Sequence, residues 1–390
     1  WTRVPPATIR DTVFAKFQNL DSILEEMPYE VLENEFNVKK GPEEGADKEK
    51  DKKKGALQII DGKTAQNVAI LLKGMKGKTI PEVVDCVQKL DERVFEVGLV
   101  NSMIKVLPSK DDIQNIAEYM AKDPTGAAQL GTAEIWALEI SKVHLAEEKL
   151  KAFSAKLSFP NKLSDLKADV HTIDIACTQV MSSKQLQRVL EYILMFGNFL
   201  NAGTPRAGVP GFKVSALSKL KETKTADGKR TMVHIIVNFM EQKHPELVAF
   251  GKELDLVADA TKVAGSTLEA DINSLGKAVK EIEASIQAVS AADIPDKSPF
   301  LEIMSSFLER AKADLEALRA QHKDMASKYT DLCKFFGEDL GKPLTPEEMF
   351  LEIFQFIDGW NKAVEENAKA RESAERDARL AAQKEKRLRE

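Results

Sequence analysis

Apolar residues recur every three or four positions through most of this chain, which is the spacing of one buried helix face. Residues that commonly cap helices precede several of these segments, at Asp61, Thr79 and Ser109. Asp112 completes a capping box with Ser109. No stretch alternates apolar and polar residues convincingly over six positions. The pattern therefore predicts an all-α protein with almost no sheet.

Two stretches in the second half of the chain show a strict alternation of three- and four-residue spacing. The first runs from Leu254 to Val289 and the second from Met304 to Leu332, with Pro295 and Pro299 between them. This is the seam pattern of two long helices. Because the break between them is short and contains proline, we expect an antiparallel pair within one chain rather than two separate dimer zippers.

The final helix has a clear predicted start, with Thr345 as the cap, Pro346 in the first turn and Glu348 completing a capping box. Apolar residues at helical spacing follow as far as Trp360. The remaining residues are almost all charged or alanine, with basic side chains last, as the helix dipole favours. We expect a solvated helix or a frayed end.

The N-terminal residues 1–20 read as an extended arm, because Pro5 and Pro6 oppose helix and apolar side chains stand on both sides of them. Such an arm cannot bury its apolar side chains alone and must lie on its own chain or on a partner. A short amphipathic helix is predicted next. Residues 37–56 carry dense mixed charge and are predicted to be a flexible tether. This tether suits an arm that docks on another subunit, although a tolerated surface insertion has the same composition.

The stretch from Gly197 to Thr231 stands out from the helical segments around it. It follows an apolar helix predicted over residues 186–196, is rich in glycine and proline at first, and then becomes rich in lysine. Segments of this kind lie on protein surfaces and often carry function. Gly197 and Gly203 allow close approach or positive φ, and Asn198 and Asn201 can bond the backbone.

Composition narrows the function classes. The chain has 390 residues and a net charge of −6, which argues against general nucleic-acid binding. Its three cysteines, Cys86, Cys177 and Cys333, are interpreted as small buried hydrophobes in a reducing compartment. No run of eighteen apolar residues occurs, so no transmembrane segment is predicted. The chain starts at Trp1 without a methionine, and we expect a fragment of a longer protein.

The sequence contains no Walker loop and no GxGxxG, HExxH or GxSxG motif. The five histidines are scattered and have no cysteine or carboxylate at ligand spacing, so neither a metal nor a cofactor is predicted. His322, on the second seam, is interpreted as a boundary residue. We therefore predict that the chain is not an enzyme but a binding or assembly protein.

A resemblance to a known family makes the prediction specific. The stretch Gly197-Asn198-Phe199-Leu200-Asn201-Ala202-Gly203, followed by Gly211-Phe212-Lys213, Leu217, Lys219-Leu220 and Thr223-Lys224, resembles the signature of the formin homology-2 domain. Trp1-Thr2 resembles the first tryptophan of the formin lasso, and Ala65 to Ile70 resembles the knob-helix motif. The resemblance covers essentially the whole chain.

The resemblance implies an elongated all-α formin homology-2 fold that closes a head-to-tail ring dimer. The implied parts are a lasso arm with a short helix (1–36), a flexible charged linker (37–56), a knob and helical body (57–185), a post with the GNFLN motif (186–250), coiled-coil helices (251–340), and a C-terminal helix with its charged tail (341–390). Each lasso would encircle the post of the other subunit.

The resemblance also implies a function. Such a domain nucleates unbranched actin filaments and stays on the growing barbed end as a tethered dimer, in the cytoplasm on the actin cytoskeleton. Profilin would be reached only indirectly, through an upstream proline-rich segment that this sequence does not contain. The alternatives are a coiled-coil scaffold or bundling protein without nucleation activity, which exposed seams would favour, and a helical enzyme, which would need a deep polar pocket.

Site residues carry over by position. For actin binding they are the knob isoleucine Ile70, the lasso/post lysine Lys224, a basic surface of Lys213, Lys219, Lys221 and Lys229, and Lys262. For dimerisation they are the lasso aromatics Trp1 and Phe14 and the post residues Gly197, Asn198, Phe199, Leu200 and Asn201. The family usually has tryptophan where this chain has Phe14, so its lasso is expected to bind less tightly or to fill a smaller pocket.

Overall fold

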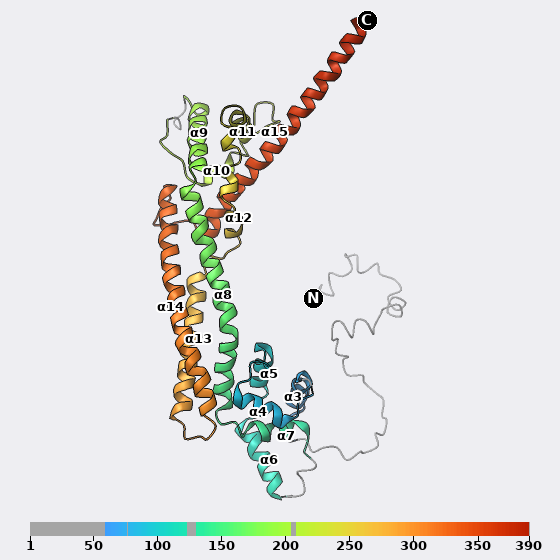
Figure 1. Cartoon of the computed structure of the whole chain (residues 1–390), viewed down its shortest axis with the longest axis vertical. Helices are drawn as coiled ribbons and strands as arrows, with labels where there is room; N and C mark the ends of the chain where they lie inside the picture. Colours follow the sequence, from blue (N-terminus) through green and yellow to red (C-terminus); the bar gives the residue numbers. More distant parts are fainter. Residues whose placement is uncertain (1–58, 76, 123–129, 204–207, 390) are drawn as a thin grey trace, which may run out of the picture. The chain divides into compact units, whose positions relative to one another are not determined.

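The computed structural model describes residues 59–75, 77–122, 130–203 and 208–389. These belong to one compact unit, Ala56–Glu390 (Figure 1). The predicted arm, its aromatics Trp1 and Phe14, the short helix at 21–36 and the linker at 37–56 lie outside the described residues. Within these residues the regular structure is helical, and the pairing of Lys224 with Thr231 is an isolated bridge. The all-α prediction is confirmed.

Five helices form the first cluster, which we call the α7 cluster because three of the others pack on α7. Their bounds are Gly62–Gly74 (α3), Ile80–Lys89 (α4), Val97–Lys105 (α5), Lys110–Lys122 (α6) and Thr132–Ile140 (α7). The predicted capping box of Ser109 and Asp112 is confirmed, with the Asp112 N–H 3.1 Å from the Ser109 hydroxyl. Trp136 is buried at the centre and donates its ring N–H to the Val106 carbonyl at 3.2 Å.

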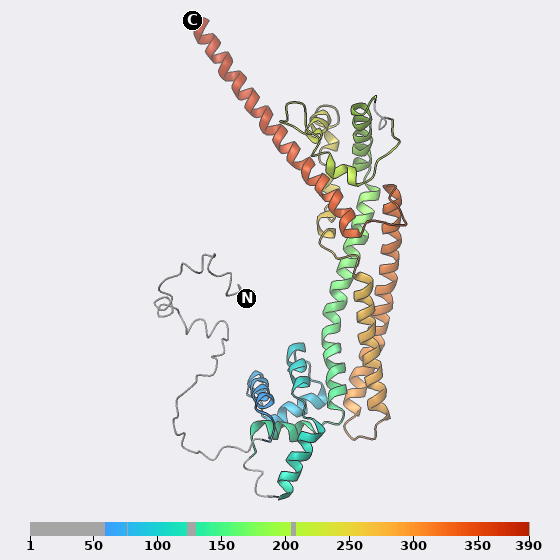
Figure 2. The ribbon, with the colours of Figure 1, turned by 180° about the vertical axis from the view of Figure 1, so that it is seen from behind.

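Three long helices form a bundle: α8 (Ala146–Ser182), α13 (Leu268–Ala291) and α14 (Ser298–Phe335), which lie side by side in both views (Figures 1 and 2). The Lys312–Glu283 ion pair and the close approach of Arg319 to Gly276 show that α13 and α14 are antiparallel, as predicted. Contacts of Phe159 with Phe307 and of Lys167 with Asp314 show that α8 and α14 run parallel. The seams of α13 and α14 are therefore buried within the chain.

The start of the first seam was predicted wrongly. The helix α13 begins at Leu268. The expected seam positions before it follow a 3₁₀ turn (η5, Phe250–Glu253) and lie in a single helical turn (α12, Val257–Ala260) and in further turns. Gly265 lies in this segment, where a Cβ would come within 2.8 Å of Pro346. The seam position Ala264 is exposed, whereas its neighbour Val263 is buried.

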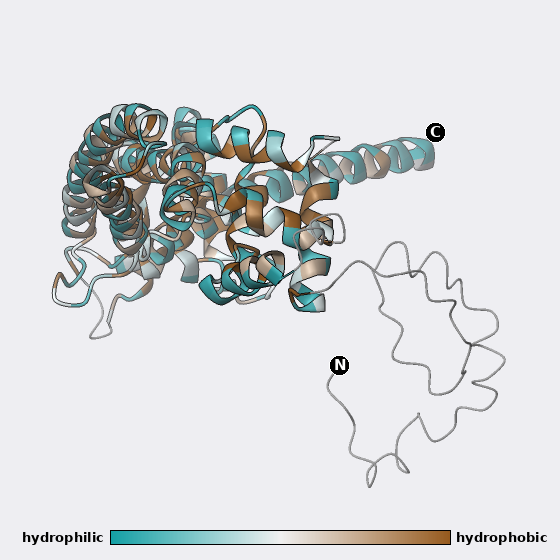
Figure 3. Ribbon diagram, turned by 90° about the horizontal axis from the view of Figure 1, so that it is seen from below, coloured by the Kyte–Doolittle hydropathy of each residue, from teal (hydrophilic) through white to brown (hydrophobic). Residues whose placement is uncertain are grey.

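The remaining helices follow the C-terminal end of α8. They are α9 (Lys184–Leu200), α10 (Ser215–Lys219), α11 (Met232–Lys243), a 3₁₀ turn η4 (Pro245–Leu247) and α15 (Pro346–Arg389). The predicted start of α15 is confirmed, because Glu348 accepts the N–H of Thr345 at 2.9 Å. Trp360 is buried against Phe250, with ring centroids 5.3 Å apart. Beyond this core α15 is mainly hydrophilic (Figure 3).

The three cysteines are buried and form no disulfide. Burial is the main cause that raises the pKa of Cys177 to about 12, so this thiol stays protonated at neutral pH. The interpretation of the cysteines as small buried hydrophobes is confirmed.

Candidate functional site

Ile70 lies on the solvent-facing side of α3. Asp61 starts this helix by accepting two backbone N–H groups of the first turn, both at 3.0 Å. The opposite face is filled by Val68 and Leu71, which are buried, whereas 61% of Ile70 is exposed. A helix whose apolar face is already filled thus presents one large apolar side chain to solvent.

The chain that leads into α3 is fixed to α7 by Glu134. This carboxylate is 2% exposed and accepts the backbone N–H groups of Ile59 and Ile60 at 2.9 and 3.1 Å. A buried carboxylate with two donors is a strong anchor. It fixes the position of α3, and with it Ile70, on the α7 cluster. Sequence reasoning missed Glu134, because nothing in its neighbourhood separates it from a surface glutamate.

The GNFLN motif is the end of a helix and not a turn. Helix α9 continues to Leu200, so the prediction that it ends at Phe196 is wrong. Asn201 caps it, donating from its side chain to the Gly197 carbonyl at 2.8 Å. Gly197 is helical, without positive φ and without a close neighbour, whereas Gly203 has the predicted positive φ of 82°.

An exposed apolar surface surrounds this helix end. Met195, Phe199 and Leu200 are 64%, 78% and 57% exposed on α9, and Val209 of the following loop is 39% exposed. Asn198 holds this loop, because its side-chain amide bonds the N–H and the carbonyl of Val209, both at 3.0 Å. We call Met195, Phe199, Leu200 and Val209 the α9 patch. Exposed apolar groups that gather in this way mark interaction sites.

Two of the predicted lysines lie against the last part of the chain. The Lys213 ammonium is 3.4 Å from Glu338, which also accepts the backbone N–H of Val214 at 3.1 Å. Lys221 donates to the side-chain carbonyl of Gln355 on α15 at 3.0 Å. Lys219 is exposed at the end of α10. Glu338 was not predicted as part of this surface, and it fixes the chain before α10.

Lys224 lies on a surface loop between α10 and α11, residues 223–231, which we call the Lys224 loop. Its side chain is exposed. The strand-like ends are joined where the Thr225 N–H donates to the Arg230 carbonyl at 2.9 Å. The Thr225 hydroxyl also donates to Asp227, and this hydrogen bond is the main cause that lowers the pKa of that carboxyl. The loop therefore has internal order although it lies on the surface.

Lys262 lies after the helical turn α12 and pairs with Asp259 at 2.8 Å. Both side chains are largely exposed, so this pair contributes little to stability and Lys262 can exchange partners.

The structure brings the lysines of the α10 region to one part of the molecule and places Ile70 in another. The α7 cluster joins α8 near its N-terminal end, where Asn101 accepts a hydrogen bond from Ser154 at 2.7 Å. The α9–α11 region follows the C-terminal end of α8 at Ser183. A helix of 37 residues spans about 54 Å. Ile70 and Lys224 of one chain therefore lie far apart.

The described residues contain no group of three or more His, Cys, Asp and Glu that could hold a metal ion. A groove of about 730 Å³ runs between α8 and α14. Two of its charged side chains, Asp174 and Lys328, form an ion pair with each other at 2.7 Å. No helix in the described part of the chain has the length and apolar character needed to cross a membrane.

The fold and these exposed surfaces define an all-helical interaction domain. Comparison with known proteins makes the class specific. The Formin Homology 2 Domain family matches residues 1–361. The chain is 31% identical to Formin-A of Dictyostelium discoideum over 98% of its own length and 31% of the relative's. For Formin-E of the same organism the identity is 30%, with coverage of 92% and 22%.

Protein diaphanous of Drosophila melanogaster is 28% identical over 97% of this chain and 35% of its own length. The chain thus spans between about a fifth and about a third of the length of these relatives. It belongs to the formin homology 2 family, as the motif around Gly197 to Lys224 predicted.

Proposed function

We propose that this chain is an actin-assembly domain that nucleates unbranched filaments and stays on barbed ends as a tethered dimer. The observation that carries this proposal is the placement of two exposed residues, Ile70 and Lys224, near opposite ends of α8. They are too far apart in one chain to form one compact contact. Each actin-binding bridge therefore combines Ile70 of one subunit with Lys224 of the other.

Ile70 and Lys224 contribute different kinds of interaction to an actin-binding bridge. Ile70 offers an apolar side chain that loses its water on contact, which is the usual source of affinity at the centre of an interface. Lys224, with Lys219 and the exposed Lys262, offers positive charge toward acidic groups on actin, which favours encounter and orientation more than affinity.

Dimerisation is assigned to the α9 patch. We propose that it receives Trp1 and Phe14 from the arm of the second subunit, because large aromatic side chains in apolar pockets are the usual anchors of interfaces. The end of α9 supports this assignment. The side chains of Asn198 and Asn201 form hydrogen bonds with backbone groups, and the Phe199 side chain is exposed to solvent. Residues 37–56 would supply the slack that lets one bridge release while the other holds.

The first test is the substitution Ile70→Ala. We expect a folded, dimeric protein whose nucleation of labelled actin falls by at least thirtyfold, the factor for an apolar anchor of about 2 kcal/mol. Leu351→Ala is the matched control, because Leu351 is 45% exposed on α15 and has no assigned contact. Normal assembly kinetics from the Ile70→Ala protein would show that the knob assignment is wrong.

The second test concerns the dimer. Deletion of residues 1–20 should yield monomers by light scattering, and Phe199→Ala should weaken the dimer by tenfold to a hundredfold. Leu380→Ala on the charged part of α15 is the control, since Leu380 is also a large exposed apolar side chain, 50% exposed against 78% for Phe199. An unchanged mass after the deletion would rule out the role of the arm.

The alternative of a coiled-coil scaffold loses its main support, because the seams of α13 and α14 are buried within the chain. Bundling without nucleation would appear in the same assay as cross-linked filaments with no increase in their number. We place the activity in the cytoplasm on the actin cytoskeleton. Profilin would act only through a proline-rich segment upstream of these residues.

A further inference from the structure

The Lys224 loop is closed at its base by two backbone contacts. The Met232 N–H donates to the Thr223 carbonyl at 2.7 Å, and Lys224 pairs antiparallel with Thr231. The backbone position of Lys224 is therefore set by Thr231, the residue that caps α11. What holds Thr231 in place thus determines where the Lys224 ammonium stands.

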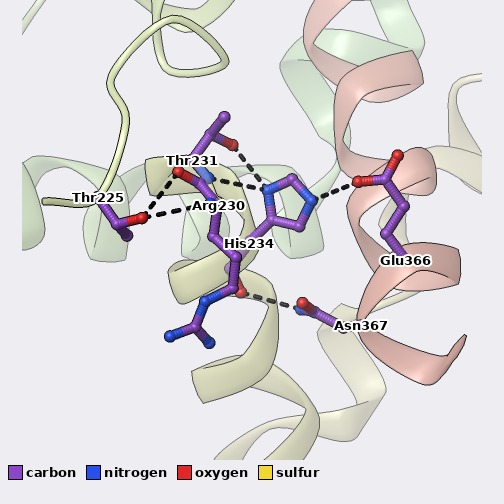
Figure 4. Close-up of polar contacts among 6 residues, drawn as sticks. All are labelled: Thr225, Arg230, Thr231, His234, Glu366 and Asn367. Atoms are coloured by element: carbon purple, nitrogen blue, oxygen red, sulfur yellow. Dashed lines mark hydrogen bonds and ion pairs between the residues drawn. The ribbon is translucent and has the colours of Figure 1, made fainter. Parts of the chain in front are cut away.

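A histidine holds Thr231. The Nδ1 atom of His234 lies 3.1 Å from the Thr231 backbone nitrogen and 2.8 Å from its hydroxyl. A backbone N–H can only donate, so Nδ1 accepts and carries no proton. The ring proton is then on Nε2, which lies 2.7 Å from a carboxylate oxygen of Glu366 on α15 and donates to it. Figure 4 shows the ring between Thr231 on one side and Glu366 on the other.

Helix α15 fixes the histidine at a second point. The next residue, Asn367, is 6% exposed and donates from its side-chain amide to the backbone carbonyl of His234 at 2.9 Å (Figure 4). Two consecutive residues of α15 thus hold the ring and the backbone of one residue of α11. Only 14% of the His234 side chain is exposed, and partners on both sides of the ring set its orientation.

We propose that His234, held by Glu366 and Asn367, is a positioning residue that sets the Lys224 loop through Thr231, and that protonation at Nδ1 releases the loop. The proposal rests on the assigned role of Lys224 in actin binding. It adds a residue that does not touch actin and a proton-dependent control of the contact.

Protonation changes the two sides of the ring in opposite directions. A proton on Nδ1 removes the acceptor for the Thr231 N–H, so the histidine half of the capping box at α11 is lost, while the Thr231 hydroxyl still accepts the backbone N–H of His234. The positive ring attracts the Glu366 carboxylate more strongly, so it stays on α15 while the loop is freed. Imidazole groups change charge between about pH 5 and 8. The other charged groups nearest in sequence on the surrounding elements are Lys362, Glu365, Lys369 and Arg371 on α15, Glu241 and Lys243 on α11, and Lys224, Asp227, Lys229 and Arg230 in the loop.

The test compares two substitutions on the 390-residue chain. His234→Leu removes the acceptor, and His234→Gln restores an acceptor at the same capping position that does not titrate. His322→Gln, at a half-buried position on α14, controls for the general loss of a histidine. The readouts are amide hydrogen-exchange protection of Thr225 and Thr231, corrected for intrinsic exchange, and actin nucleation, each at pH 7.5 and 5.5.

We expect protection of the loop amides to fall about fivefold in His234→Leu at both pH values, the effect of losing one capping hydrogen bond of about 1 kcal/mol. The unsubstituted protein should lose protection by a similar factor only at pH 5.5, and His234→Gln should change little with pH. The nucleation rate, expressed relative to that of His234→Gln at the same pH, should be lower for His234→Leu at both pH values and lower for the unsubstituted protein only at pH 5.5.

Hydrogen exchange tests the proposal without actin. Equal loop protection in His234→Leu and the unsubstituted protein, or the same pH dependence in His234→Gln, would overturn it. If His234→Leu does not fold by circular dichroism, Glu366→Ala and His234→Gln carry the test. A protected loop with no effect of Lys224→Ala on actin would instead contradict the proposed function and leave the positioning role standing.

Discussion

The two ends of α8 are held by different kinds of contact. At the N-terminal end the Lys149 side chain is 2% exposed and pairs with Asp296 of the α13–α14 connection at 2.7 Å. Its ammonium also donates to the Asp296 backbone carbonyl at 3.1 Å. At the C-terminal end Ser183 closes α8 and opens α9, accepting the Leu186 N–H at 3.0 Å. Beyond it, the α9 patch and the Lys224 loop depend on hydrogen bonds at or near the surface.

This difference fits the roles proposed for the two ends. A buried ion pair is strongly destabilised when one partner is removed, so it keeps two elements in one arrangement. Surface hydrogen bonds contribute about 1 kcal/mol each and can be exchanged for contacts with a partner. The end that carries Ile70 is expected to behave as a rigid platform, and the end that carries Lys224 as an adjustable one.

The largest effect is expected at the rigid end. Lys149→Met leaves the partly buried Asp296 without its cation, and the free energy of unfolding should fall by about 3 kcal/mol. Chemical denaturation of the two proteins at pH 7 measures this difference. Lys151→Met is the control, because Lys151 lies on the same helix and forms an exposed ion pair with Glu147, one turn before it. Equal stability of the Lys149→Met and control proteins would contradict the comparison.

The same pair predicts a pH dependence. Burial alone would raise the pKa of Asp296, but the hydrogen bond and charge of Lys149 lower it overall below its usual range. A carboxylate with a depressed pKa adds stability above its unfolded pKa, near 3.9, and this contribution is lost as the pH falls through the folded value. The stability gap between the unsubstituted and Lys149→Met proteins should therefore narrow below about pH 4.

A smaller effect is expected at the adjustable end. Asn198→Ala frees the loop at Val209, and the free energy of unfolding should change by about 1 kcal/mol or less. Because the same loop carries part of the α9 patch, the dimer should weaken by about fivefold. Sedimentation equilibrium measures that change. A loss of stability as large as that of Lys149→Met would remove the distinction between the two ends.

The sequence predicted those features that depend on local chemistry. The helix starts at Asp61 and Thr345 were found because a capping side chain and its N–H partners lie within four residues. The place of α8 as the third helix of the bundle was not found. Its buried face includes Lys149 and Lys156, which interrupt the apolar pattern, and their partners Asp296 and Glu92 lie far away in the sequence.

The candidate site shows the same division. The exposure of Ile70 agrees with the family resemblance, whereas its spacing alone suits a core residue. The helical end of α9 was missed because Gly197 was expected to allow close approach or positive φ after a helix over residues 186–196, whereas Asn201 supports one more helical turn. His234 had a readable signal, since it stands three residues after Thr231, where a capping box has glutamate or glutamine.

Mixed dimers test the central claim, that one bridge combines Ile70 of one subunit with Lys224 of the other. A dimer of one Ile70→Ala chain and one Lys224→Ala chain keeps one intact bridge between subunits and none within a subunit. A dimer of an unsubstituted chain and a doubly substituted chain has the opposite arrangement. The measurement is barbed-end binding, read from the slowing of elongation on filament seeds. We predict binding by the first dimer and not by the second, and the reverse result would contradict the account.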